Sequence, residues 1–184
     1  MNILIYSIVI VITVLADFIS KRIVVANMEL YESIPLIKDV LHITYITNDG
    51  AAFGSMSNFR VFFMVASVVA ILGIGAYLFI NNKSFSKPLG ISLSMIIGGG
   101  VGNMIDRIFN GDVIGEGVVV DFIDFCAFPN LWMWIFNLAD SFVCVGAGIF
   151  IFFYVREEIQ AYKKSKAAKN ITEEVNNDDP HTDN

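Results

Sequence analysis

Two aspartates, Asp121 and Asp140, stand in stretches of sequence that are otherwise apolar. They occur in the segments VVVDFIDF and IFNLADSF. A carboxylate at the centre of a helix in lipid costs roughly 2.5–3.5 kcal/mol on insertion scales. Such residues therefore face a protein interior or a wet cavity, and they are functional candidates by default. Two of them predict either acid–base chemistry with a shared proton or a path for protons or ions.

The composition is that of a membrane protein. Of the 184 residues, 55% are hydrophobic and 16% are charged, whereas a soluble domain carries about 25% charged residues. The net charge of −6 comes largely from the acidic C-terminal end, and the chain has no surface pattern typical of nucleic-acid binding. The two cysteines, Cys126 and Cys144, are too few to form a disulfide framework.

Four segments reach the roughly 20 residues needed to cross a bilayer. They are residues 3–25, 59–80, 89–109 and 131–154. The first lacks a basic start and a cleavage pattern, so we interpret it as a retained helix. Residues 1–166 are predicted to form one membrane domain. Residues 167–184, which are polar and poor in aromatic residues, are predicted to form a disordered tail.

A small sheet is expected outside the bilayer. Residues 41–47 alternate between apolar and polar side chains, which predicts a strand, and residues 48–50 predict a turn. The predicted fold class is an α-helical integral membrane protein with four transmembrane helices and a small extracytoplasmic β-sheet between the first and second helices. Basic residues flank the link at 81–88 and follow residue 155, so the positive-inside rule predicts cytoplasmic termini.

With this topology, the polar residues of the bundle converge near the outer membrane surface. The group comprises Asp17, Lys21, Asn48, Gly50, Asn103, Asp106, Arg107, Asp121, Asn137 and Asp140. Scattered structural polar residues would not gather at one level of a bundle. We therefore expect one polar site at the outer ends of the helices.

Several of these residues also have simpler interpretations. Asp17 and Lys21 could be an ion pair on one helix face with Lys21 snorkelling to the interface, or they could hold a substrate group. Gly98 and Gly102 are typical of close helix packing. Arg107 could pair with an acid, bind a substrate carbonyl or hold a catalytic carboxylate.

The two acids also have alternatives. Asp140 could cap a helix, but its place inside the expected fourth segment favours an interior role. Asp124 competes with Asp121, which we favour because it directly follows an apolar run. The histidines, His42 and His181, have no partner at metal-ligand spacing, so hydrolysis here would use paired carboxylates without a metal or cofactor.

A proton- or ion-coupled transporter is the main alternative to an enzyme. Asp17, Asp121 and Asp140 would then form a relay. A relay needs polar groups through the whole bilayer, but the inner halves of the helices offer little beyond Thr13 and Ser67. The residues alone therefore favour an enzyme over a transporter modestly.

Five segments in order resemble the prolipoprotein signal peptidases, the signal peptidase II family of bacterial membrane aspartyl proteases. They are DFISK at 17–21, NDGAAF at 48–53, GGGVGNMIDR at 98–107, VVDF at 119–122 and FNLADS at 136–141. Phe18 stands where glutamine is common in the family, and residues 113–117 lengthen the second outer link.

The resemblance implies a function and a set of site residues. The enzyme would cleave lipid-modified prolipoproteins before the diacylglyceryl cysteine, without a cofactor, at the extracytoplasmic face of the bacterial cytoplasmic membrane. Its partners would be these substrates and membrane lipids, with no nucleic acid. Asp121 and Asp140 match the catalytic pair, and the other matching polar positions are Asp17, Lys21, Asn48, Gly50, Asn103, Arg107 and Asn137.

Overall fold

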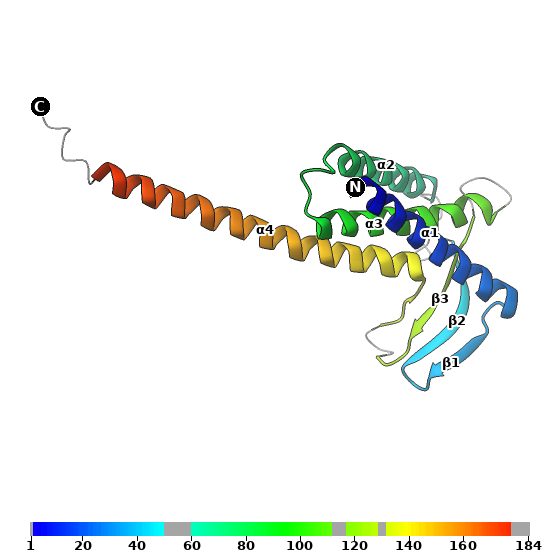
Figure 1. The fold of residues 1–184 in the computed structure, drawn as a ribbon. Helices are drawn as coiled ribbons and strands as arrows, with labels where there is room; N and C mark the ends of the chain where they lie inside the picture. The colour runs from blue at the N-terminus through cyan, green and yellow to red at the C-terminus, as the bar shows by residue number, and fades with distance from the viewer. Residues whose placement is uncertain (1, 50–59, 112–116, 129–131, 178–184) are drawn as a thin grey trace, which may run out of the picture.

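The described residues form four helices and a four-stranded sheet (Figure 1). The computed structural model describes residues 2–49, 60–111, 117–128 and 132–177. In chain order, the elements are α1 (Asn2–Asn27), β1 (Ser33–Ile37), β2 (Leu41–Asn48), α2 (Arg60–Ile80), α3 (Lys87–Phe109), β3 (Val119–Phe125), β4 (Ile135–Phe136) and α4 (Leu138–Asn177).

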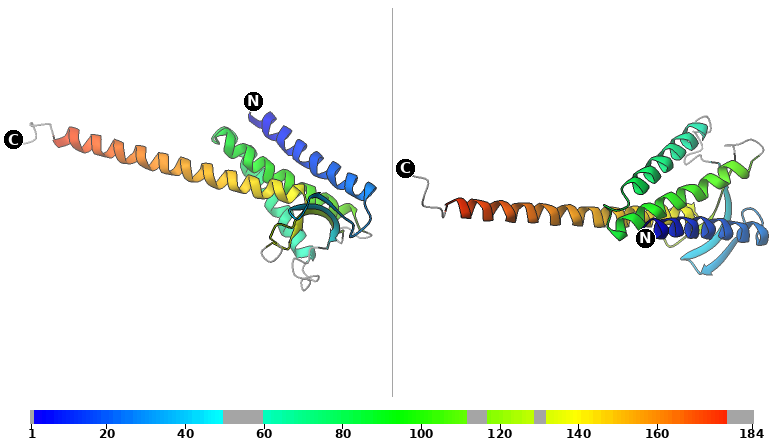
Figure 2. Two further views of the ribbon diagram at one scale, coloured as in Figure 1. Left: turned by 90° about the horizontal axis from the view of Figure 1, so that it is seen from below. Right: turned by 45° about the horizontal axis from the view of Figure 1, so that its top comes forward.

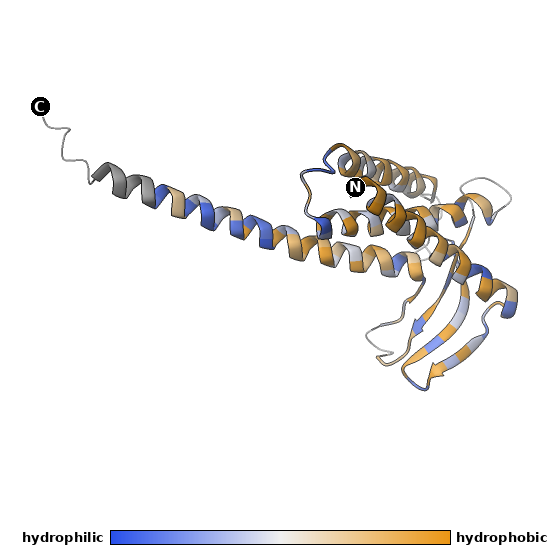
Figure 3. Ribbon diagram, in the orientation of Figure 1, coloured by the Kyte–Doolittle hydropathy of each residue, from blue (hydrophilic) through white to orange (hydrophobic). Residues whose placement is uncertain are grey.

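The helices have the length and surface of membrane helices. Within the described residues, α1, α3 and the 138–170 part of α4 are long and apolar enough to cross a bilayer. Helix α2 has 21 residues, about 32 Å at 1.5 Å per residue, close to the thickness of a hydrocarbon core. Apolar colour covers α1, α2 and the bundle part of α4, whereas hydrophilic colour dominates the outlying part of α4 (Figure 3). The expected helical membrane protein is confirmed.

Helix α3 is the centre of the bundle because its glycines let two other helices approach closely. A Cβ added at Gly98 would lie 2.7 Å from Thr13, and one at Gly102 would lie 2.6 Å from a carboxylate oxygen of Asp17. A Cβ at Gly99, on the side facing α4, would collide with the carbonyl of Ala139. The small-residue spacing therefore packs α1 against α3, as predicted, while Gly99 admits α4.

The sheet differs from the prediction in its origin. Its strand order is β1-β2-β3-β4, and all three pairings are antiparallel. Strands β3 and β4 come from the link between α3 and α4, so the link between the first two helices supplies only half of the sheet. Val24 of α1 packs with Val120 and Phe122 in a buried cluster. This contact anchors the sheet to the end of the bundle where α1 ends.

Helix α4 differs from the prediction at both ends. It begins at Leu138, after the short strand β4, whereas the apolar pattern predicted a start near residue 131. It continues to Asn177 as one helix of 40 residues, whereas the sequence predicted a disordered tail from residue 167. Alanine, lysine and glutamate in that segment are good helix formers, and extending an existing helix needs no new nucleus. The distal half of α4 projects away from the bundle (Figure 2).

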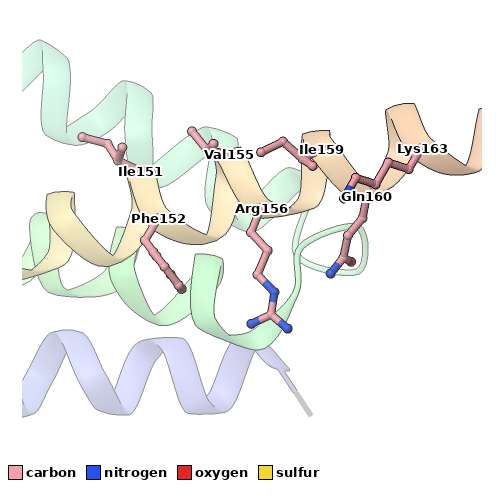
Figure 4. Close-up of a pocket in the computed structure, with 7 residues that line it drawn as sticks. All are labelled: Ile151, Phe152, Val155, Arg156, Ile159, Gln160 and Lys163. Atoms are coloured by element: carbon pink, nitrogen blue, oxygen red, sulfur yellow. The ribbon is translucent and has the colours of Figure 1, made fainter.

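A cavity of about 510 Å³ lies on the flank of α4 (Figure 4). Its lining belongs to α4 alone and changes from Ile151 and Phe152 to Arg156 and Lys163. A change from apolar to basic side chains along one helix is typical of a membrane interface. The described lining carries no aspartate, glutamate, histidine, cysteine or serine, so it offers no acid pair or nucleophile for hydrolysis.

Candidate active site

Asp121 lies in the middle of β3 and is 2% exposed. Its Oδ2 accepts a hydrogen bond of 3.0 Å from Nδ2 of Asn48, at the end of β2. Its Oδ1 accepts one of 2.6 Å from Nδ2 of Asn137. The pairing of β2 with β3 brings Asn48 to this position, because Asn48 is opposite Val119 and Ile46 is opposite Asp121.

Asp140 lies in the first turn of α4 and takes part in capping, contrary to the prediction. The Asn137 side-chain Oδ1 accepts the backbone N–H of Asp140 at 3.0 Å, and the Asp140 Oδ2 accepts the backbone N–H of Asn137 at 3.2 Å. This reciprocal arrangement is a capping box. Because α4 begins at Leu138 rather than near residue 131, Asp140 sits at the positive end of the helix dipole, where a negative charge is stabilised.

Two asparagines join the two aspartates. Nδ2 of Asn103, on α3, donates to Oδ1 of Asp140 at 2.8 Å. Nδ2 of Asn137 donates to Asp121 and lies 3.0 Å from Oδ1 of Asn103. Asp121 is therefore held by amide groups from β2 and from the cap residue Asn137, and Asp140 by those of Asn103 on α3 and Asn137. The arrangement brings the two predicted acids into one site.

Beneath this pair lies a buried charge cluster around Lys21. Its Nζ lies 2.7 Å from Oδ2 of Asp17 and 3.0 Å from Oδ2 of Asp106, and all three side chains are at most 2% exposed. It also donates to Oδ1 of Asn103 at 2.9 Å. Lys21 does not snorkel to the interface, because three protein oxygens hold it in the interior. It supports Asn103, which in turn contacts Asp140.

Asp17 and Asp106 connect the cluster to other elements. Oδ1 of Asp17 accepts the backbone N–H of Ala139 at 2.9 Å, which ties α1 to the first turn of α4. Oδ2 of Asp106 accepts the backbone N–H of Val120 at 3.2 Å, which ties α3 to β3. The sequence grouped Asp106 with Arg107, but its described ion partners are Lys21 and, at 4.0 Å, Arg22.

Burial and charge alter the acidity of Asp121. Burial raises the pKa of Asp121 from 3.8 to about 6, and the negative charge of Asp140 adds to the rise. The pKa is lowered in part by hydrogen bonds from Asn48 and Asn137 and by the positive charge of Lys21. Near neutral pH, Asp121 therefore holds a proton far more readily than an ordinary aspartate does.

An apolar cavity of about 290 Å³ opens beside Asp140. The chain N-terminal to α4 supplies its aromatic wall, and the indole N–H of Trp132 donates to the carbonyl of Trp134 at 2.8 Å. The described residues that line it are Trp132, Trp134, Phe136, Asp140, Ser141 and Cys144. Sequence reasoning assigned the start of this stretch to a helix and so missed the cavity, although two tryptophans close to an acid were a usable signal.

The remaining predicted positions are placed differently. Gly50 and residues 112–116 of the longer link lie outside the described residues. Arg107 is half-buried on α3, and its backbone carbonyl accepts the N–H of Gly117 at 3.2 Å. His42 has no partner at metal-ligand spacing along the sequence, but the fold brings it beside Asp124 and Cys126.

Two aspartates linked by asparagine side chains, one of them buried with a raised pKa, at one end of a helical membrane bundle fit a membrane peptidase of the aspartic type. Comparison with known proteins agrees. Residues 9–156 match the family described as Signal peptidase (SPase) II. The chain belongs to the signal peptidase II family, and it is an aspartic-type peptidase.

Individual relatives cover most of the chain. The lipoprotein signal peptidase of Halothermothrix orenii is 42% identical over 151 residues, covering 82% of this chain and 95% of the relative. That of Halalkalibacterium halodurans is 38% identical over 164 residues, covering 89% and 100%. Two solved bacterial membrane enzymes have TM-scores of 0.71 and 0.70 at 29% and 30% identity, covering 83% and 81% of this chain and 88% and 91% of theirs.

The hydrogen bond from Asn48 gives a prediction about pH. Replacing Asn48 with alanine removes a donor that favours the ionised form of Asp121, so the pKa of Asp121 should rise above about 6. The upper apparent pKa of the pair rises with it, and the alkaline limb of the kcat/KM profile should move to higher pH. Asn81→Ala, which removes a side-chain bond to Tyr77 at the opposite end of the bundle, is the control. An unmoved alkaline limb in Asn48→Ala would contradict the assignment.

Proposed function

We propose that Asp121 and Asp140 are the catalytic pair with which this chain removes signal peptides from lipid-modified prolipoproteins. Cleavage takes place just before the lipidated cysteine. The observation that carries the proposal is the amide-linked carboxylate pair at the outer end of the bundle, where both acids are tied to Asn137. The names of the relatives from Halothermothrix and Halalkalibacterium supply the substrate class.

The two acids take different roles in the mechanism. Asp140 takes a proton from a water molecule, which attacks the scissile carbonyl. Asp121, with its raised pKa, is the protonated member and donates a hydrogen bond to that carbonyl. The C–N bond then breaks, and the amine leaves with a proton from the pair.

The surroundings of the pair hold the substrate. The open cavity beside Asp140 is lined with aromatic rings and receives apolar parts of the substrate, whose acyl chains remain in the bilayer. Gly50 permits a close approach of the peptide backbone, and Arg107 holds the peptide extended. Asp17, Lys21, Asn48, Asn103 and Asn137 are positioning residues, and the described contacts of the first two lie within the protein.

A transporter would need a continuous polar path, and the described part of the bundle has none. In the inner half of α3, the buried hydroxyls of Ser92 and Ser94 donate to carbonyls of their own helix at 2.7 Å. Such hydroxyls are already satisfied and do not extend a relay. The polar cluster ends near the outer side of the bundle, as a hydrolytic site requires.

Mass spectrometry of a defined substrate tests the proposed function. Purified protein is incubated with a diacylglyceryl prolipoprotein and, in parallel, with the same precursor lacking the lipid. The expected result is loss of the signal peptide mass from the lipidated precursor only. An intact lipidated precursor, together with acid-driven proton flux into proteoliposomes, would favour the transporter instead.

The orientation in the membrane is also part of the proposal. Both termini are cytoplasmic, and the sheet and the aspartate pair lie on the extracytoplasmic side of the bacterial cytoplasmic membrane. The basic residues of the α2–α3 link and of α4 beyond residue 155 support this orientation by the positive-inside rule.

Cysteine labelling of intact cells should report this orientation. In a chain with both native cysteines replaced by serine, Val40→Cys lies in the exposed turn between β1 and β2 and should react with a membrane-impermeant maleimide. Lys83→Cys, in the exposed α2–α3 link, should react only after the cells are permeabilised. Labelling of Lys83→Cys and protection of Val40→Cys in intact cells would reverse the topology.

A further inference from the structure

A second group of side chains with chemical potential lies on the sheet, apart from the aspartate pair. His42, Asp124 and Cys126 are half-buried, and one ligand atom from each lies within 4.8 Å of the others. The strand register explains the grouping. His42 of β2 is directly opposite Asp124 of β3, and Cys126 follows two residues later and so returns to the same face.

A chain of hydroxyl groups orients two of these side chains. Nδ1 of His42 lies 3.4 Å from the Ser33 hydroxyl, which lies 2.8 Å from the Thr44 hydroxyl. The Thr44 hydroxyl donates to Oδ2 of Asp124 at 2.7 Å. Because the chain ends on a carboxylate, the consistent direction has the Nδ1–H of His42 donating to Ser33 and Ser33 donating to Thr44. Nε2 of His42 then keeps its lone pair.

This pattern is the one that surrounds metal-binding histidines. A metal-ligating histidine almost always donates its other ring N–H to an oxygen, and its carboxylate neighbours are themselves hydrogen-bonded. Here both conditions hold around an imidazole, a carboxylate and a thiol. Borderline divalent ions, above all Zn²⁺, take this mixture of nitrogen, oxygen and sulfur ligands.

We propose that His42, Asp124 and Cys126 bind a zinc ion, with water as a fourth ligand. Tetrahedral zinc with bonds of about 2.0–2.3 Å places its ligand atoms roughly 3.5 Å apart. The three donors, within 4.8 Å of one another, reach that spacing by small side-chain rotations. Binding deprotonates Cys126, and the released proton passes to solvent.

The ion would fasten β2 to β3. These two strands also carry Asn48 and Asp121, but His42 lies at the opposite end of β2 from Asn48. The hairpin joining β1 to β2 lies at the end of the sheet away from the helices (Figure 1). Zinc at this place stabilises the sheet and takes no part in peptide hydrolysis.

Cobalt substitution of the purified full-length protein tests the site directly. Co²⁺ should produce the visible bands of a tetrahedral site together with a near-ultraviolet thiolate-to-metal band, and Zn²⁺ should displace both. Cys126→Ser should abolish the thiolate band, whereas Cys144→Ser, which removes the other cysteine, should leave the spectrum unchanged. A spectrum without a thiolate band, or one lost equally in both variants, overturns the proposal.

Zinc affinities of single variants distinguish the residues that bind the ion from the residues that only orient them. His42→Gln and Asp124→Asn should weaken zinc binding at least about 100-fold, and Ser33→Ala should weaken it roughly 10–100-fold, the range for such supporting groups. Zn²⁺ should also raise the thermal midpoint of the wild-type protein but not that of His42→Gln. Equal zinc affinity in the wild type and His42→Gln, with both proteins folded by circular dichroism, refutes the site.

Discussion

Replacing Asp140 with asparagine should reduce cleavage of a diacylglyceryl prolipoprotein by at least about 10⁴-fold, the scale seen when one member of a catalytic unit is lost. Asparagine keeps the shape and one acceptor oxygen for Asn103. The start of α4 remains capped because Oδ1 of Asn137 still accepts the backbone N–H of residue 140. The amide cannot take a proton from water. Asp121→Asn should have a similar effect, because the amide cannot serve as the acid of the pair.

The double variant and a neighbouring acid make this prediction specific. Asp121→Asn combined with Asp140→Asn should be little worse than either single change, because residues that act as a unit are strongly non-additive. Asp124→Asn, measured in zinc-free buffer, should retain substantial activity, since Asp124 bonds to Thr44 rather than to the asparagine network. Near wild-type turnover by a folded Asp140→Asn protein would remove Asp140 from the mechanism.

Replacing Lys21 with methionine should be among the most destabilising single changes in the chain. Lys21 is the ammonium between two buried carboxylates, Asp17 and Asp106. Removing one partner of a buried ion pair costs about 3–5 kcal/mol because it leaves uncompensated charge. For a domain of this size, that corresponds to a fall in thermal midpoint on the order of 10 °C, measured in detergent.

Two further variants distinguish loss of the cluster from loss of a positive charge. Lys83→Met removes an exposed lysine and should leave the midpoint nearly unchanged. Adding Asp106→Asn to Lys21→Met should recover part of the stability, because one of the stranded carboxylates is gone. If Lys21→Met were as stable as the wild type but bound substrate poorly, Lys21 would be a substrate-binding residue instead.

The sequence predicted the parts of the site that depend on residue type and helix order. Asp121, Asp140, Asn103 and Asn137 are recognisable because polar groups in apolar segments need partners, and the order of the helices brings them to one end. The sequence did not predict which structural role each of these residues has. The sequence placed Asp140 well inside the fourth helix, which argued against a capping role. The reason is that residues 131–136 are apolar and fit a helix as well as a strand, and two of them form β4.

The contacts that lie far apart in sequence were the least predictable. Lys21 has an acid four residues before it, so local spacing suggested a surface pair, whereas the third member, Asp106, comes from α3. The grouping of His42 with Asp124 and Cys126 depends on the register of β2 against β3. Register depends on the hydrophobic pattern and on turn geometry, and here it shifts between Ile43 and Ile46, so residue spacing along the chain could not reveal the grouping.

The hydrogen bond from Ala139 to Asp17 joins residues separated by 122 positions, and this has a consequence for biogenesis. During translation, α1 enters the membrane first and α4 last. A chain stalled before residue 138 lacks Asp140 and also leaves the buried carboxylate of Asp17 without its backbone partner. Incomplete chains should therefore be both inactive and loosely packed, which makes them ready targets for membrane quality-control proteases.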